Sequence, residues 1–477
     1  MTPAPPKREL SSTRPVGSPP RQPASVALAI ALATTGVLPV FLTGALAVQL
    51  QGSLHVGTTA IGGAVATFFG ASALSSVRAG RLAERIGPFK VMLVAVGLAV
   101  VTLLGVGLLV RSLPALLGFL ALGGLSNGAM QPAVNLLLAR AVDDRRQGLA
   151  FGVKQAAIPT ATLLSGVAVP ALALTAGWHV AYLAAAGLAA LVGAVLVSGG
   201  RQLIPEPAGR HPPSPAADDP RAPSPTTRQA SGLDHRGRGD QPVQTDQKSF
   251  DARPLVFLAA AMACAVAASN AMGSFVVPGA VHDGVAPGLA GLVSAAGSVV
   301  GLSARVGFGW RSDRRGLRGR RAADAHLGTV TALIAVGAVG YTGLALGRLD
   351  LLVPAVLVAY GGGWGYNGLF NLAVVRAYPD SPARATGVTQ VGTYVGGMVG
   401  PLGFGIVVDH LGFDVGWAVC GGLAVLAVAA FTVSRRRLRG APARGVDPGH
   451  AHLAARRRVP GVAPASVADA DGSAMEP

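Results

Sequence analysis

Long apolar runs alternate with short polar segments along most of the chain. Each run is roughly 20 residues long, the length that crosses the hydrocarbon core of a bilayer as a helix. Only 13% of the residues are charged, and these cluster between the runs. The pattern predicts an all-α polytopic membrane protein. The twelve expected transmembrane helices are 25–47, 58–77, 91–110, 114–139, 148–173, 178–198, 254–277, 288–308, 327–347, 351–375, 385–407 and 413–433.

One long polar segment divides the apolar pattern into two parts. Residues 199–253 are rich in Pro, Arg, Asp, Ser and Gly, a composition that cannot bury a core. We therefore expect a cytosolic linker there, between an N-terminal six-helix half at 25–198 and a C-terminal half at 254–433. The tails at 1–24 and 434–477 are expected to be disordered and cytosolic.

The net charge of +17 can be interpreted from the positions of the Lys and Arg residues along the chain. With the first tail inside, all Lys and Arg residues but four lie in cytosolic segments or at the helix ends facing them. The exceptions are Arg111 and Arg348 outside, and Lys154 and Arg305 within apolar runs. This bias follows the positive-inside rule, so the charge indicates topology and contact with anionic lipids, with no nucleic-acid partner. The expected location is the cell (inner) membrane, with both termini cytoplasmic.

Three pairs of short motifs recur at corresponding places in the two halves. The pairs are GRLAERIG and GWRSDRRG at 80–87 and 309–316, NLLLARA and NLAVVRA at 135–141 and 371–377, and GVKQ and GVTQ at 152–155 and 387–390. Their conserved order indicates an internal duplication. The first pair, with Gly, an acid four residues later, Arg and a second Gly, is typical of a short cytosolic hairpin between membrane helices.

The hairpin pair resembles the loop signature of the major facilitator superfamily, whose transporters consist of two pseudo-symmetric six-helix halves. The resemblance implies that the halves rock about a central site and that the protein is a monomer. It also implies gating contacts at the cytosolic face, although Glu84 replaces the usual Asp and Arg311 a usual apolar residue. The alternative is that these charges only set topology. The gating candidates are Gly80, Glu84, Arg85, Gly87, Gly309, Asp313, Arg314 and Gly316.

Polar residues form stripes on two of the predicted helices. Asn127 and Gln131 are four residues apart in one run, and Trp364 and Asn367 share a face of another. Such residues are costly in a bilayer unless they face a cavity or one another. The resemblance implies that they line the central cavity; the alternative is hydrogen bonding between packed helices. Further members of these stripes or of the cavity set are Asn135, Tyr360, Asn371 and Asn270.

Lys154 is the sharpest candidate for contact with a substrate. It lies within an apolar run, where it either forms a cationic site for an anion or extends to the cytosolic interface. Its neighbour Gln155, and Gln390 at the matching place in the other half, favour the first interpretation. Arg305 is a candidate second cation, although an Arg near a helix end more often pairs with loop carboxylates or helix ends.

Acidic residues are absent from the middle of every predicted helix. Many proton-coupled exporters of cationic drugs use a membrane-embedded carboxylate, which this chain does not offer. Drug antiporters of the superfamily that the chain resembles carry an Arg early in the fourth helix and a Gly-Pro signature in the fifth. This chain has neither. The GVKQ motif at 152–155 and the Pro before the following turn instead resemble cyanate-type and related organic-anion permeases.

We therefore predict a secondary transporter of the superfamily that moves a small anionic or polar metabolite across the cell membrane by alternating access, in the direction of uptake, with or without protons. The alternative is a proton-coupled exporter of drugs or metabolites. An enzyme is not expected, because the His residues are too dispersed to form a site. Cys264 and Cys420 have no metal-ligand spacing to any His, so no metal or cofactor is expected.

Overall fold

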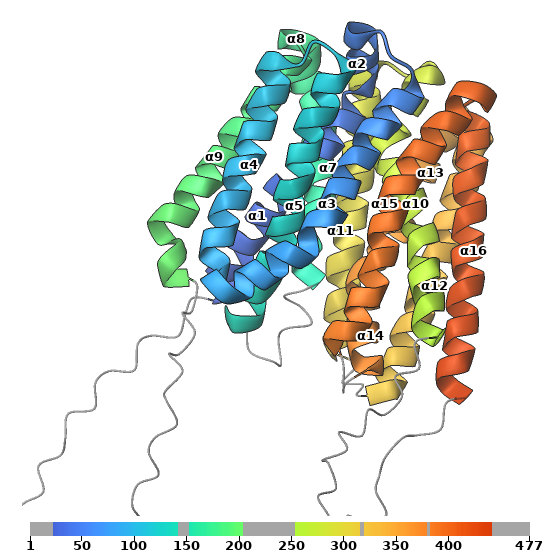
Figure 1. Cartoon of the computed structure of the whole chain (residues 1–477). Coiled ribbons are helices and arrows are strands. Elements are labelled where there is room, and N and C mark those ends of the chain that lie inside the picture. Colours follow the sequence, from blue (N-terminus) through green and yellow to red (C-terminus); the bar gives the residue numbers. More distant parts are fainter. Residues whose placement is uncertain (1–21, 142–151, 204–252, 315–318, 379–381, 441–477) are drawn as a thin grey trace, which may run out of the picture.

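A computed structural model describes residues 22–141, 152–203, 253–314, 319–378 and 382–440. Within these residues the chain is helical and has no strand, and the long helices run side by side (Figure 1). Helices suit apolar runs of this length because, in lipid, every backbone N–H and C=O must find its partner within the same segment.

The N-terminal half contains six membrane-crossing segments, four of which are continuous single helices. The first is α1 followed by the short α2, and the fifth is α7, a π-helical turn η1 and α8. The elements are α1 (Gln22–Ala45), α2 (Ala47–Leu54), α3 (Thr58–Ile86), α4 (Pro88–Leu109), α5 (Leu113–Ala141), α7 (Ala157–Ala168), η1 (Val169–Ala173), α8 (Leu174–Ala176) and α9 (Trp178–Leu203).

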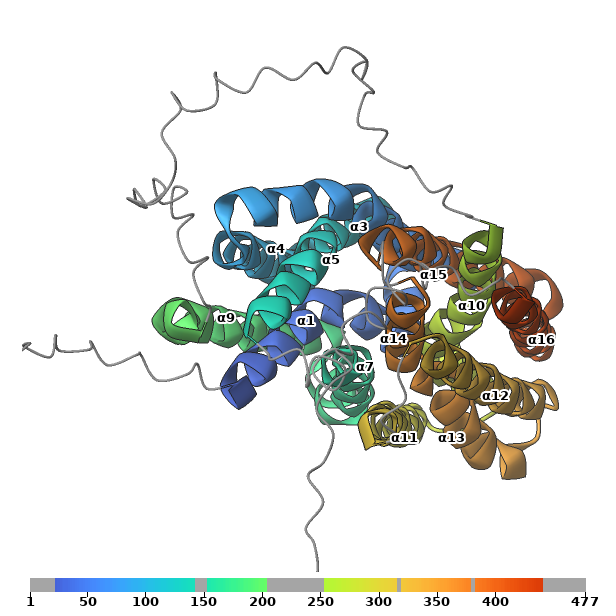
Figure 2. The same cartoon turned by 90° about the horizontal axis from the view of Figure 1, so that it is seen from below.

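The C-terminal half repeats this arrangement with one interruption, between α13 and α14. Its elements are α10 (Arg253–His282), α11 (Pro287–Arg314), α12 (Gly319–Ala345), α13 (Leu349–Gly365), α14 (Asn367–Ala377), α15 (Pro382–Leu411) and α16 (Phe413–Gly440). Viewed along the bundle, α9 and α16 lie at the periphery, whereas α1, α7, α11 and α14 lie near the border between the halves (Figure 2).

Eleven helical segments of the described chain are long and apolar enough to cross a membrane. They coincide with the expected spans other than the tenth, whose place is taken by α13 and α14, with a break at Tyr366. Several helices extend beyond the expected span ends, among them α3 to Ile86, α9 to Leu203 and α16 to Gly440. A helix continues past the bilayer because each added residue gains a backbone hydrogen bond whether or not its side chain is apolar.

The duplicated Gly motif is more helical than its sequence suggests. Residues 80–86 belong to α3, and the turn to α4 consists of Gly87 alone, whose φ of 91° is readily accessible only to glycine. In the second copy, residues 309–314 belong to α11, and residue 316 lies outside the described residues. The prediction of a hairpin loop is therefore wrong for most of the motif, because the helices extend through the charged positions of the motif.

The two halves approach each other most closely at one end of the bundle. We call the end where α1 begins and α16 ends the lower end, and the opposite end the upper end; the ribbons of the halves diverge toward the lower end (Figure 1). Higher in the bundle, a Cβ atom on Gly62 of α3 would lie 2.4 Å from the carbonyl oxygen of Pro401 in α15, and one on Gly44 of α1 would lie 2.6 Å from Cα of Ser274 in α10. Glycine thus permits direct backbone contact between the halves.

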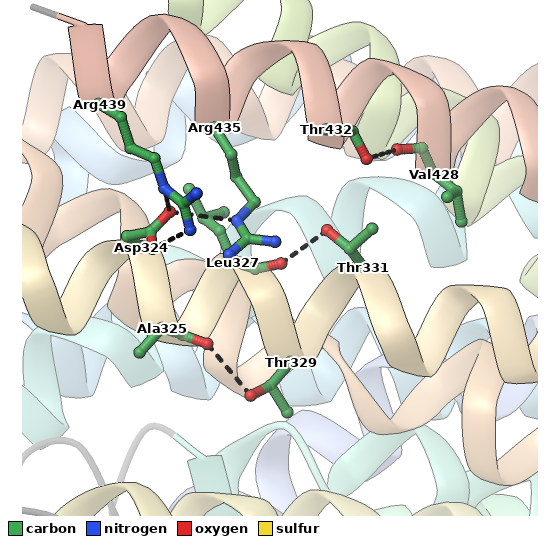
Figure 3. Close-up of polar contacts among 9 residues, drawn as sticks. All are labelled: Asp324, Ala325, Leu327, Thr329, Thr331, Val428, Thr432, Arg435 and Arg439. Carbon is green, nitrogen blue, oxygen red and sulfur yellow. Dashed lines mark hydrogen bonds and ion pairs between the residues drawn. The ribbon is translucent and has the colours of Figure 1, made fainter.

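An ion-pair cluster joins α12 and α16 near the lower end (Figure 3). Asp324 accepts hydrogen bonds from Arg439 at 2.6 and 2.8 Å and from Arg435 at 3.2 Å. The nearby Thr331 and Thr432 hydroxyls donate to carbonyl groups of their own helices at 2.7 Å (Figure 3). The polar groups of this cluster therefore find their partners within the C-terminal half.

Candidate substrate-binding site

The fifth segment begins with an irregular turn that carries Lys154 and Gln155. In a regular helix, the Gln155 carbonyl would accept from the backbone N–H of residue 159. That residue is Pro159, which has no N–H. The carbonyl is therefore open to another donor, and Nη1 of Arg305, from α11 in the other half, donates to it.

The interruption between α13 and α14 supplies the second acceptor for Arg305. The helical ladder breaks at Tyr366, and Nε of Arg305 donates to the nearby Trp364 carbonyl over 2.7 Å. Arg305 is 2% exposed, and its Nη2 is buried with no partner among the described residues. One guanidinium thus bridges helix ends in both halves and retains one unsatisfied donor. Pairing with helix ends was the alternative interpretation of this Arg.

Lys154 belongs to a hydrogen-bonded chain inside the N-terminal half. Its ammonium donates to Oε1 of Gln131, whose Nε2 donates to Oδ1 of Asn127 at 3.1 Å. Asn127 in turn donates to the hydroxyl of Ser72 on α3 at 3.1 Å. With 5% exposure, Lys154 points into this network and does not extend to the membrane interface. The predicted polar stripe on α5 therefore connects α3, α5 and the fifth segment.

Aromatic rings form a wall beside Arg305. Trp364 is 1% exposed and meets Phe41 of α1 and Tyr360 of α13 edge-on, at centroid distances of 5.7 and 4.9 Å. The Tyr360 hydroxyl lies 2.9 Å from that of Ser294 on α11. The Arg305 guanidinium lies 6.0 Å from the Trp364 ring centroid, a distance that allows a cation–π attraction. This part of the site is apolar, with a cation at its edge.

Four predicted polar residues lie apart from the Lys154 network. Gln390 and Asn135 are exposed, and Asn367 is half-buried without a hydrogen bond to either cation. Asn270 is 6% exposed and lies against Gly397 of α15. For Gln390 the reason is helical rotation: each residue turns the helix by about 100°, so the adjacent Thr389 is buried instead.

The gating candidates form no contact between the halves in the described chain. Glu84 and Arg85 are exposed and make no ion pair there. Arg314 lies over the ring of Trp310 at 3.9 Å, within α11. Of the remaining candidates, Gly80 packs near α5, Gly87 forms the α3–α4 turn, and the position of a Cβ on Gly309 is open. The side chain of Asp313 and the whole of Gly316 lie outside the described residues.

Sequence reasoning missed Ser72, Phe41 and the two backbone carbonyls that Arg305 binds. A signal for one of them was present: Pro159 stands four residues after Gln155 and removes its helical partner. Ser72 gave no signal, because isolated Ser residues in apolar helices usually bond their own backbone; Ser72 does so at 2.9 Å to Phe68.

The sequence model described as Major Facilitator Superfamily matches residues 24–401, most of the chain. The chain belongs to this superfamily. As a member of it, the protein is a multi-pass membrane transporter, and the expectation from the Gly motifs is confirmed.

Solved structures share the fold of this superfamily member. One is a bacterial homolog of the human lysosomal transporter Spinster in an inward-facing, unoccupied conformation, with 14% identity, a TM-score of 0.61, and coverage of 89% of this chain and 98% of that one. The same homolog in an inward-facing, occupied conformation has 13% identity, a TM-score of 0.59, and coverage of 88% and 98%. No curated protein sequence matches the chain. At these identities the likeness concerns the fold.

Proposed function

We propose that this superfamily member takes up a small organic anion by alternating access and binds it between Lys154 and Arg305. One observation carries the proposal. Among the Lys, Arg, Asp and Glu side chains that the structure describes, Lys154 and Arg305 alone are buried. Two cations without an acidic partner are unfavourable in a medium of low dielectric constant, and an anion between them would offset that cost.

The available donors suit a carboxylate or a similar oxyanion. Nη2 of Arg305 has no partner among the described residues, and the Lys154 ammonium uses one of its three N–H groups for Gln131. Arg presents a planar fork that matches two oxygens, whereas Lys acts as a compact point charge. The aromatic wall around Trp364 would contact the apolar part of the metabolite.

Coupling to protons has two routes in this proposal. The substrate's own acid group can carry the proton, or Lys154 can release and rebind one, because a Lys amine is able to deprotonate whereas an Arg guanidinium is not. Plain facilitated diffusion needs neither route. Each mode leaves the anion between the same two side chains, so the site can be tested without first settling the coupling.

The proposal is tested by a thermal-shift screen of the detergent-purified protein against organic anions, neutral sugars and organic cations. A ligand at 100 times its dissociation constant adds about 2.7 kcal/mol of stability. We expect an anion to stabilise the parent protein and to lose that effect in Lys154→Ala. The matched control is Lys90→Ala, which removes an exposed Lys of α4 and should leave the shift unchanged.

The opposite result would favour the second candidate, a proton-coupled exporter of drugs or metabolites. The aromatic wall supports this alternative, because Trp and Tyr faces attract organic cations. Stabilisation by cations alone, or by anions equally in the parent and Lys154→Ala, would contradict the anion site. Flux in vesicles then decides the direction: cation efflux without anion movement supports the exporter.

A further inference from the structure

A carboxylate at the upper end of the bundle joins the two halves directly. Asp409, in the last turn of α15, accepts a hydrogen bond from the backbone N–H of Thr58 at 3.0 Å and from that of Thr59 at 2.7 Å. Both donors belong to the first turn of α3. The contact therefore connects the C-terminal half to the N-terminal half at the end where their ribbons are close (Figure 1).

The first turn of α3 needs such a partner. A helix begins with backbone N–H groups that have no acceptor inside the helix, and its N-terminus carries a partial positive charge. The residue before α3 is Gly57, which has no side chain to cap these groups. Asp409 supplies both the acceptors and the negative charge from the other half. A Cβ atom on Gly57 would lie 2.9 Å from Oδ2 of Asp409, so glycine also leaves room for the carboxylate.

The surrounding contacts hold α3 and α15 together at this end. A Cβ atom on Gly405 of α15 would lie 2.7 Å from the Thr58 carbonyl oxygen. Nε2 of Gln51, on α2, donates to the Thr58 hydroxyl at 3.2 Å. The first turn of α3 is thus positioned from its own half by α2 and bound from the other half by α15.

The internal duplication provides a comparison for this contact inside the same molecule. The GVKQ and GVTQ motifs align Gly177 with Gly412, both at positive φ, and therefore Leu174 with Asp409. The Gly motifs of α3 and α11 align Thr59 with Gly288. The related interface exists, and it is apolar: Cδ1 of Leu174 lies 3.4 Å from the position of a Cβ on Gly288.

The start of α11 also differs from that of α3 in a way that matches its partner. The residue equivalent to Thr58 is Pro287, which has no N–H to donate. One copy of the interface thus pairs a carboxylate with free N–H groups, whereas the other pairs Leu with a Pro-Gly start. The charged contact is a specific addition at one side of the upper end.

We propose that Asp409 is a latch that holds the upper end closed, and that its release from α3 is a required step in opening that end. Hydrogen bonds to a charged group are short and directional, so a small separation of the halves removes them. The apolar contact at Leu174 has no preferred direction and tolerates sliding. The two interfaces therefore act differently when the halves rock. The Asp409 contact must break, whereas the Leu174 contact can slide and stay in place.

The latch is tested by measuring the distance between the halves at the upper end. Spin labels are attached at Ser112→Cys and Leu349→Cys, both exposed positions, in a background with Cys264→Ala and Cys420→Ala. Pulsed electron paramagnetic resonance then measures the distance between the two labels. Asp409→Asn removes the charge and one acceptor. We expect a longer distance to appear, with the ratio of open to closed upper ends rising about tenfold. No substrate is added, so the result is independent of the proposed anion site.

Two further variants make the test decisive. Thr58→Pro copies the start of α11, removes one donor at a position where helices accept Pro, and should open the upper end in the same direction even where Asp409→Asn fails to fold. Asp414→Asn is the control, because that acid lies at the upper end but faces Gly347 within its own half. An unchanged distance distribution in both latch variants, or an equal shift in Asp414→Asn, would overturn the proposal.

Discussion

Arg305 shows how one side chain can satisfy two helix interruptions that are far apart in sequence. Pro159 leaves the Gln155 carbonyl without its helical donor, and the break at Tyr366 opens the ladder next to Trp364. The guanidinium reaches both carbonyls because its N–H groups diverge from a rigid plane. The same residue then offers its remaining donor to the site.

This geometry predicts a specific defect in Arg305→Lys. The variant keeps the positive charge but loses the fork, so at least one buried carbonyl loses its partner. We expect the free energy of unfolding to fall by about 1–3 kcal/mol, the usual cost of a buried polar group left unsatisfied. Thermal unfolding in detergent measures it.

Arg348→Lys is the matched control for that prediction. Arg348 forms an ion pair with Asp350 in which both side chains are more than 60% exposed. An exposed pair of this kind contributes about 0–1 kcal/mol, so stability should hardly change. Equal losses in the two variants would show that the bridge to the two carbonyls is unimportant.

Helices of this bundle pack through glycine at several crossings, one of which lies between α12 and α13. A Cβ atom on Gly362 would lie 2.3 Å from the backbone nitrogen of Gly337. No real Cβ atom tolerates that distance from backbone. The two helices can therefore approach this closely only while both positions lack side chains.

We expect Gly362→Ala to separate α12 from α13 and to lower the free energy of unfolding by about 1–3 kcal/mol, as overpacking does elsewhere. Gly63→Ala, in α3, is the companion variant, because the space around its Cβ position is open. There the substitution should raise the free energy of unfolding by up to about 1 kcal/mol, because Ala has less backbone freedom than Gly in the unfolded chain. Urea or thermal unfolding in detergent compares the pair, and a neutral Gly362→Ala would contradict the close-packing account.

At the scale of the whole molecule, the two halves meet at the upper end and diverge at the lower one (Figure 1). The contacts that join them include the Asp409 latch, the glycine crossings and the Arg305 bridge. A rocking movement must break the upper contacts and form new ones below. Exposed Glu84 and Arg85 lie at the lower end, where such contacts would form.

The distribution of charge predicts which end faces the cytosol. The lower end carries the basic helix ends, such as those of α11 and α16, and positive residues remain on the cytosolic side. A green fluorescent protein fused to the C-terminus should therefore fluoresce, whereas an alkaline phosphatase at the same place should be inactive. Phosphatase activity at the C-terminus would invert the topology, and a phosphatase inserted after Ser112 should show the opposite behaviour.

Much of the fold was accessible from sequence, because a bilayer imposes a length and an apolar composition on each helix. The spans other than the tenth are confirmed, and so is the superfamily. The break at Tyr366 was not foreseen, since an apolar run does not reveal where its backbone ladder is interrupted. Lys154, Gln131 and Asn127 were selected by their cost in lipid, and the structure links them in one network.

The partners of these residues depended on the three-dimensional arrangement. Gln390 is exposed although its motif matches that of Gln155, because helix rotation decides which neighbour faces inward. Arg305 finds the Gln155 carbonyl, and Asp409 finds the start of α3, through contacts between residues more than a hundred positions apart. By itself, the sequence determined which segments lie in lipid and which in water, and from that the helical class and the family. Only the tertiary structure decided which polar groups meet, because hydrogen bonds act over about 3 Å and depend on how the two halves pack.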